Sequence, residues 1–222
     1  MNKMILWVAV INLLFFVLAI ALYGSMPAEM ASHWNARGIA DGTMSRFWGM
    51  FLVPFMSLGL SALLLAIPRI DPLKANIQKF QGYYYGFIIA FLVYFLYIYL
   101  LTLAWNLGWT FNFSTAIIPS IGFLMFFIGL MLGKAKRNFF IGIRTPWTLS
   151  NDEVWDRTHR LGGTLFKISG VIVILLAFLP RVAILGLIVL MFGTTIGLVI
   201  YSYVIYRKLG LPPPQPPIGR PS

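Results

Sequence analysis

The sequence predicts an all-α polytopic membrane protein with six transmembrane helices and both termini in the cytoplasm. Its 222 residues are 59% hydrophobic and only 10% charged, whereas soluble domains carry about 25% charged residues. Too few polar side chains are present to cover the surface of a water-soluble globule. The chain has no cysteine, which excludes disulfides, thiolate metal sites and cysteine nucleophiles.

Six apolar stretches are long enough to cross a bilayer core, which takes about 20 helical residues. The first is too long for the apolar part of a signal peptide, so we expect a retained span. Pro119 predicts a boundary or kink near the start of the fourth, and Pro180-Arg181 predicts a tight turn between the last two. The six spans are residues 5–23, 47–68, 83–105, 115–132, 164–180 and 182–206.

The distribution of lysine and arginine predicts the orientation of these spans. With the N-terminus inside, all of the 17 basic residues lie in inner segments except Arg37, Arg46 and Arg181. The positive-inside rule therefore places both termini in the cytoplasm of a cell (plasma) membrane protein. Because this asymmetry also explains the net charge of +11, we expect no direct nucleic-acid binding.

The chain divides into three predicted regions. Residues 1–132 form a four-helix membrane region with an outer loop at 24–46. Residues 133–206 combine an inner motif at 133–163 with a helical hairpin at 164–206, and residues 207–222 form a proline-rich disordered tail. Several glycines in the spans allow close helix contacts, among them a GxxxG motif. They are Gly59, Gly86, Gly122, Gly129, Gly193 and Gly197.

The outer loop holds the candidate residues for ligand binding. Ser25 is placed to cap a short interfacial helix with Pro27 in its first turn. On such a helix two of the candidates, four residues apart, share a face and offer two metal ligands or an acid–base pair. Turn signals follow at residues 35–38 and 41–42. The candidates are Glu29, His33, Asn35, Gly38 and Asp41.

Residues 142–163 concentrate the polar chemistry of the chain, with three of its six acidic residues and one of its two histidines. Ser150 and Glu153 form a predicted capping box, so we expect a helix from Asn151. Trp155 and His159 share one face of it. Gly162-Gly163 is expected to end this helix or bend it into the fifth span.

Charge pairs at i,i+4 spacing, Glu153 with Arg157 and Asp156 with Arg160, would stabilise this inner helix. One interpretation is an amphipathic helix lying on the inner leaflet. The other is a docking surface for a cytoplasmic partner. The candidate docking residues are Arg144, Thr145, Pro146, Trp147, Ser150, Asn151, Glu153, Trp155, Thr158, His159 and Arg160.

The inner stretch GKAKRNFFIGIRTPWTLSNDEVWDRTHRLGG, which begins at Gly133, resembles the signature of the SdpI family of bacterial immunity proteins. The outer loop MPAEMASHWNARGIADGTMSR resembles that of the uncharacterised membrane domain that commonly precedes this signature. The chain departs from the pattern at Ala31-Ser32, where a proline usually stands two residues before the histidine, and at Arg46, where lysine is common. The resemblance extends over about residues 5–206.

The resemblance implies a sensor or immunity protein that protects against a secreted peptide toxin. It also implies a cytoplasmic transcriptional repressor as a possible partner of the inner loop. The alternatives are a membrane-embedded, metal-dependent hydrolase using Glu29 and His33, or an exporter of a small molecule or peptide. The sequence has neither HExxH nor G-x-S-x-G, so we expect no enzyme and no cofactor. The spans hold no charged residue at mid-membrane, which disfavours ion-coupled transport.

Overall fold

The computed structural model describes residues 2–212 and confirms a helical, multi-pass membrane protein. Six helices within this range are long and apolar enough to cross a bilayer. They are α1 (Asn2–Leu22), α2 (Arg46–Ile70), α4 (Gln81–Asn106), α5 (Phe113–Leu132), α7 (Asp152–Leu176) and α8 (Pro180–Lys208). Shorter elements connect them: the 3₁₀ turn η1 (Tyr23–Ser25), strands β1 (Glu29–Trp34) and β2 (Ala40–Ser45), α3 (Lys74–Gln78) and α6 (Pro146–Ser150).

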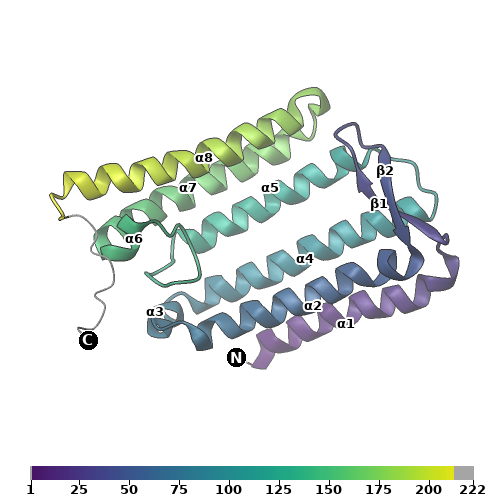
Figure 1. Cartoon of the computed structure of the whole chain (residues 1–222), viewed down its shortest axis with the longest axis horizontal. Coiled ribbons are helices and arrows are strands. Elements are labelled where there is room, and N and C mark those ends of the chain that lie inside the picture. Colours follow the sequence, from purple (N-terminus) through teal and green to yellow (C-terminus); the bar gives the residue numbers. More distant parts are fainter. Residues whose placement is uncertain (1, 213–222) are drawn as a thin grey trace, which may run out of the picture.

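The long helices run side by side, and the connecting elements gather at the two ends of the bundle (Figure 1). The β1–β2 hairpin lies over one end, which we call the outer end. The helices α3 and α6 lie at the opposite, inner end, together with the 133–145 loop. The two regions that the sequence marks as candidate sites are therefore separated by the full length of the bundle.

Two prolines inside α2 explain why buried tyrosines of α4 face this helix. Pro54 and Pro68 have no N–H, so each leaves the carbonyl four residues earlier without its helical partner. A tyrosine hydroxyl from α4 donates to each of these two oxygens. The contacts are Tyr99 to Met50 at 2.9 Å and Tyr84 to Leu64 at 2.7 Å.

Glycines bring α5 and α7 into backbone contact. A Cβ added at Gly122 would lie 2.6 Å from the Gly170 carbonyl oxygen, and one at Gly163 would lie 2.8 Å from that of Gly129. In lipid, close approach of this kind is a main source of helix–helix attraction. The GxxxG motif of α8 behaves differently, because nothing lies within 4 Å of a Cβ at Gly193 or at Gly197. Gly59 and Gly86 also have open surroundings.

The predicted outer interfacial helix is wrong, because these residues form an antiparallel hairpin. Ser25 belongs to the turn η1 and caps no helix. The alternation of the strand buries Met30 completely against Gly49 at the start of α2. The side chain of Asn106, on α4, accepts from the Ala31 N–H at 2.8 Å and donates to its carbonyl at 3.1 Å. We call this pair of hydrogen bonds the Asn106 clamp. It is a tertiary contact, because Asn106 and Ala31 are 75 residues apart in the sequence.

The inner helix, predicted to end or bend at Gly162-Gly163, does not end there. It continues without interruption into the fifth span as α7. The two glycines let other segments pack closely against α7. A Cβ at Gly162 would lie 2.9 Å from Ile143, and one at Gly163 would meet Gly133. The turn to α8 falls at residues 177–179, and Pro180 begins α8. Most of the predicted tail, residues 213–222, lies outside the described residues.

Candidate functional site

The centre of the inner region is a stacked pair of rings on the buried face of α7. Trp155 and His159 lie with their ring centroids 3.9 Å apart and their planes at 14°, as their four-residue spacing predicts. Both are almost fully buried, at 0% and 1% exposed. Trp155 Nε1 donates to the carbonyl of Ala135 at 2.9 Å. The ring pair therefore holds the preceding loop against α7.

Both ring nitrogens of His159 form hydrogen bonds with backbone groups. The N–H of Ile143 donates to Nε2 at 2.9 Å, and Nδ1 lies 2.8 Å from the Trp155 carbonyl oxygen. Because Nε2 accepts, Nδ1 must carry the proton in this arrangement. Gly142 has φ +115°, and a Cβ there would lie 2.4 Å from His159 Nε2. Only glycine both adopts this conformation and leaves room for the imidazole.

The capping box lies at Thr145, not at Ser150 as predicted. Thr145 caps α6 by accepting from the Thr148 N–H at 3.2 Å, and the Thr148 hydroxyl accepts from the Thr145 N–H at 2.9 Å. Pro146 occupies the first turn, where its missing N–H is tolerated. The Thr145 hydroxyl also lies 3.1 Å from that of Ser202 on α8. These bonds attach the short helix α6 to the end of α8.

Asn151 caps α7, which therefore begins at Asp152 and not at the predicted Asn151. Its side chain accepts from the N–H groups of Glu153 at 2.9 Å and Val154 at 3.0 Å. Ser150 instead donates to the carbonyl of Trp147 at 3.1 Å. The predicted cap at Ser150 is therefore wrong, and the cap lies one residue later, where the Asn151 side chain accepts from two N–H groups.

Ion pairs join the 133–138 segment to the first turns of α7. Lys136 pairs with Asp156 at 2.8 Å, and Arg137 pairs with Asp152 at 2.6 Å. The predicted pair of Asp156 with Arg160 is thus wrong, because a lysine from the loop reaches this carboxylate. The predicted pair of Glu153 with Arg157 is confirmed.

Sequence reasoning missed two buried polar residues that shape the inner loop. Asp71, at the end of α2, accepts from the N–H of Leu73 at 2.6 Å and of Phe139 at 2.9 Å. Asn138 accepts from Phe140 and Ile141 N–H and donates to two loop carbonyls. They are 2% and 0% exposed. An Asp-Pro directly after an apolar span was the available signal for the first.

The inner candidates fall into a buried set and an exposed set. Thr145, Trp155, Thr158 and His159 are buried, so they support the surface and do not form it. Trp147 is half-buried and packs against Tyr203 of α8, with ring centroids 5.1 Å apart. The exposed candidates are Arg144, Pro146, Ser150, Glu153 and Arg160.

In the outer hairpin, His33 and Asp41 form a pair. The Nδ1 atom of His33 lies 2.5 Å from a carboxylate oxygen of Asp41, and the two side chains are 73% and 43% exposed. Asp41-Gly42, predicted as a turn, lies in β2, and Gly42 is the partner of His33 across the hairpin. Glu29 stands at the far end of β1, opposite Ser45. No cluster of three metal-ligating residues occurs within residues 2–212.

Asn35 and Gly38 build the predicted hairpin turn. The Asn35 side chain accepts from the N–H of Arg37 at 2.9 Å, and Gly38 has φ +75°. The turn is attached to α5, because the Asn112 side chain donates to the Arg37 carbonyl at 2.8 Å and Ser114 donates to that of Asn35 at 2.9 Å. The hairpin is therefore held against the start of α5.

Both regions match known families. Residues 134–204 match the SdpI/YfhL protein family, and residues 10–58 match a domain of unknown function (DUF1648). Immunity protein SdpI of Bacillus subtilis (strain 168) is 27% identical over 203 residues, which cover 90% of this chain and 94% of that protein.

The chain is therefore similar to the SdpI family, through the family match at residues 134–204 and through this relative. No solved structure matches it. The SdpI match contains the inner loop, α6, α7 and most of α8, so it includes the Trp155–His159 pair with its loop contacts. The DUF1648 match contains the outer hairpin. The relative is an immunity protein, and neither family description names an enzyme.

Proposed function

We propose that this protein is a plasma-membrane immunity protein that protects its cell from a secreted peptide toxin, and that the toxin contacts the outer hairpin. The similarity to an immunity protein along 90% of the chain carries this proposal. The exposed His33–Asp41 pair supports the choice of the hairpin, because exposed polar groups held on a rigid support are suited to recognition.

The orientation of the bundle is part of the proposal. We infer that the hairpin faces outward and that the 133–151 segment lies in the cytoplasm, together with both termini. The support is the distribution of basic residues: of the 17, only Arg37, Arg46 and Arg181 fall in the segments assigned to the outside.

Single-cysteine labelling tests this orientation without a background, because the natural chain has no cysteine. In intact cells, an impermeant maleimide is expected to label Arg37→Cys, in the exposed hairpin turn. It is expected to label Ser150→Cys, in the exposed inner segment, only after permeabilisation. Labelling of both positions from the same side would overturn the orientation.

The inner region is proposed to dock a cytoplasmic repressor when toxin is bound. Its exposed candidates, Arg144, Pro146, Ser150, Glu153 and Arg160, would make the contacts. The buried Trp155–His159 pair would hold the loop in shape. Such a response requires two states of the bundle with different toxin affinity, since a ligand shifts an equilibrium only by this difference.

Protection of a toxin-sensitive bacterial host tests the proposed function. Wild-type protein is expected to restore growth, and His33→Ala is expected to lose protection, because it removes the exposed ring of the hairpin. Trp147→Ala and His159→Ala are expected to reduce protection by loosening the inner region. Growth at a series of toxin concentrations is measured, with protein amount in the membrane quantified for each variant.

Arg181→Gln is the control for this assay, since Arg181 is exposed in the first turn of α8 and does not belong to the hairpin. It should protect as well as wild type. If His33→Ala also protected fully at equal membrane amounts, toxin contact at the hairpin would be refuted. Failure of the wild-type protein to protect would refute the immunity function itself.

The alternatives have less support. For the metal-dependent hydrolase, His33 Nδ1 is paired with Asp41, and Glu29 lies opposite Ser45 at the far end of β1. For an exporter, the intramembrane polar groups should line a path. Instead Asn12, Ser57 and Ser61 bond to one another between α1 and α2 at 3.0 and 3.1 Å, as packing contacts between helices do.

A further inference from the structure

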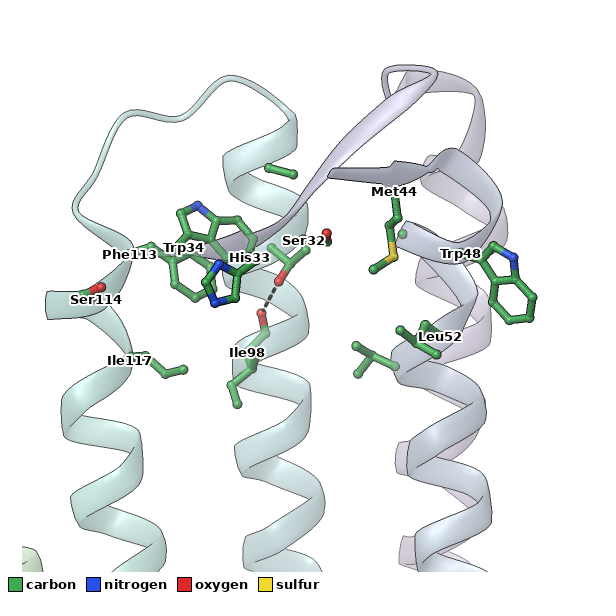
Figure 2. Close-up of a pocket in the computed structure, with 14 residues that line it drawn as sticks. Ser32, His33, Trp34, Met44, Trp48, Leu52, Ile98, Phe113, Ser114 and Ile117 are labelled. Carbon is green, nitrogen blue, oxygen red and sulfur yellow. Dashed lines mark hydrogen bonds between the residues drawn. The ribbon is translucent and has the colours of Figure 1, made fainter. Parts of the chain in front are cut away.

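A cavity of about 300 Å³ lies beneath the outer hairpin, at the ends of three helices. Its walls come from α2, α4 and α5, and the hairpin forms its roof (Figure 2). The walls are mainly apolar, with Trp48 and Leu52 on one side, Ile98 behind, and Phe113 and Ile117 on the other side. Ligand pockets have this character, with an apolar lining and a few placed polar groups.

Several polar groups at the cavity have partners within the protein, whereas Trp34 Nε1 is buried without one in the described part of the chain. The Thr102 hydroxyl donates to the Ile98 carbonyl at 3.0 Å, as the dashed line in Figure 2 shows. Ser114 donates to the Asn35 carbonyl at 2.9 Å, and the backbone of Ala31 is bonded to Asn106. The hydrogen bonds of these groups are therefore satisfied within the protein, so they need no ligand as a partner.

His33 differs from these groups. Asp41 accepts from Nδ1, so in the neutral ring the lone pair of Nε2 is available as an acceptor. Among the hydrogen bonds within residues 2–212, none engages this nitrogen. In Figure 2 the imidazole extends from the hairpin toward Ile98, at the rim of the cavity. The side chain is 73% exposed, so the acceptor stands at a mouth that water reaches.

The charges at this mouth disfavour a phospholipid. Within residues 2–212, no lysine or arginine lines the cavity, so this part of the chain places no cation there to hold a phosphate. The nearby carboxylate of Asp41 would repel one and favours a donor or a cation instead. The volume lies at the lower limit of ligand pockets, which range over about 300–1,000 Å³. It is suited to one bulky side chain.

We propose that this cavity receives one bulky apolar side chain of an extended peptide, while an N–H beside it donates to His33 Nε2. The inference rests on the proposed function, because it names the part of the toxin that the hairpin recognises. An apolar anchor in a pocket, with a polar contact at the rim, is the usual arrangement of peptide recognition.

The first test uses the purified full chain in nanodiscs, with Ile117→Cys as the single cysteine in the cavity wall. N-acetyl-tryptophanamide is expected to slow its reaction with a water-soluble methanethiosulfonate several-fold. N-acetylglycinamide, with the same amides and no side chain, should leave the rate unchanged. Phe178→Cys, 80% exposed in the α7–α8 connection, should react at the same rate with and without either compound.

Adding His33→Phe to Ile117→Cys tests the acceptor, since it keeps an aromatic ring but removes the nitrogen. The slowing by N-acetyl-tryptophanamide is expected to weaken several-fold. If Ile117→Cys does not fold, Leu52→Cys on the opposite wall serves as the reporter. No slowing in either reporter, or equal slowing with His33→Phe, would overturn the proposal. So would equal slowing by the short-chain lipid dihexanoylphosphatidylglycerol, which would show a lipid site.

A cavity-filling variant separates this inference from the proposed function. Leu52→Trp places a larger side chain, an indole ring, in the cavity and leaves His33 and Asp41 in place. In the protection assay, at equal membrane amounts, it is expected to lose protection. If it protected fully while wild type also protected, the cavity would not be the toxin site, although the immunity function would stand. If wild type gave no protection, the immunity function would fail, and the labelling result would still decide whether the cavity binds the probe.

Discussion

Replacing Gly170 with alanine is expected to destabilise the protein strongly. The new Cβ would lie 2.5 Å from the Gly122 carbonyl oxygen and 2.7 Å from the Phe126 nitrogen. Both obstacles are backbone atoms of α5, so no side chain can turn aside to make room. Overpacking typically costs about 1–3 kcal/mol, and we expect the upper end of this range or beyond.

Gly193→Ala is the matched control for this prediction. Gly193 lies in the interior of α8, and nothing lies within 4 Å of its added Cβ. Alanine is favoured over glycine in a helix by roughly 0.5–1 kcal/mol, so this variant should be as stable as wild type or slightly more stable. Unfolding in mixed detergent–SDS micelles, followed by circular dichroism, measures both. Equal stability of the two variants would refute the close contact of α5 with α7.

Replacing Trp155 with alanine is expected to have the second large effect, a loss of about 3–5 kcal/mol, the range for truncating a buried aromatic residue. The change removes the ring that stacks on His159 and leaves the Ala135 carbonyl without its donor. We therefore expect the 133–151 segment to loosen from α7. Rapid proteolysis within this segment, together with the unfolding curve, measures the effect.

Two further variants make this prediction specific. Trp155→Phe keeps a ring for stacking but removes the N–H, so it should cost only about 1–3 kcal/mol, the cost of one unsatisfied buried polar group. Trp109→Ala changes a tryptophan that is 69% exposed and should have little effect on stability. If Trp155→Ala left the segment resistant to protease, the ring pair would not be what holds the loop.

Local patterns predicted the helical parts of this structure well. Hydrophobicity alone located the six spans, and four-residue spacing placed Trp155 and His159 on one face and paired Glu153 with Arg157. These predictions succeed because they depend on residues within one helix. The similarity to the SdpI family was also recognised from the sequence, through the two motifs.

The errors arose where distant residues compete for the same groups. The Asn106 clamp on Ala31 favours a strand where local signals indicated a helix. Lys136 took the carboxylate of Asp156 that Arg160 was expected to hold. Neither partner is close in sequence to the residue that it engages, so the outcome could not be predicted from spacing.

The sequence by itself determined that this chain is a helical membrane protein similar to the SdpI family, because hydrophobicity and motif content are properties of the residue string. Only the tertiary structure decided which glycines bring helices together, since Gly170 meets a backbone while Gly193 meets open space. It alone decided that His33 pairs with Asp41 across a hairpin and faces a cavity. The physical reason is that contact distances, unlike hydrophobicity, depend on where the other helices lie.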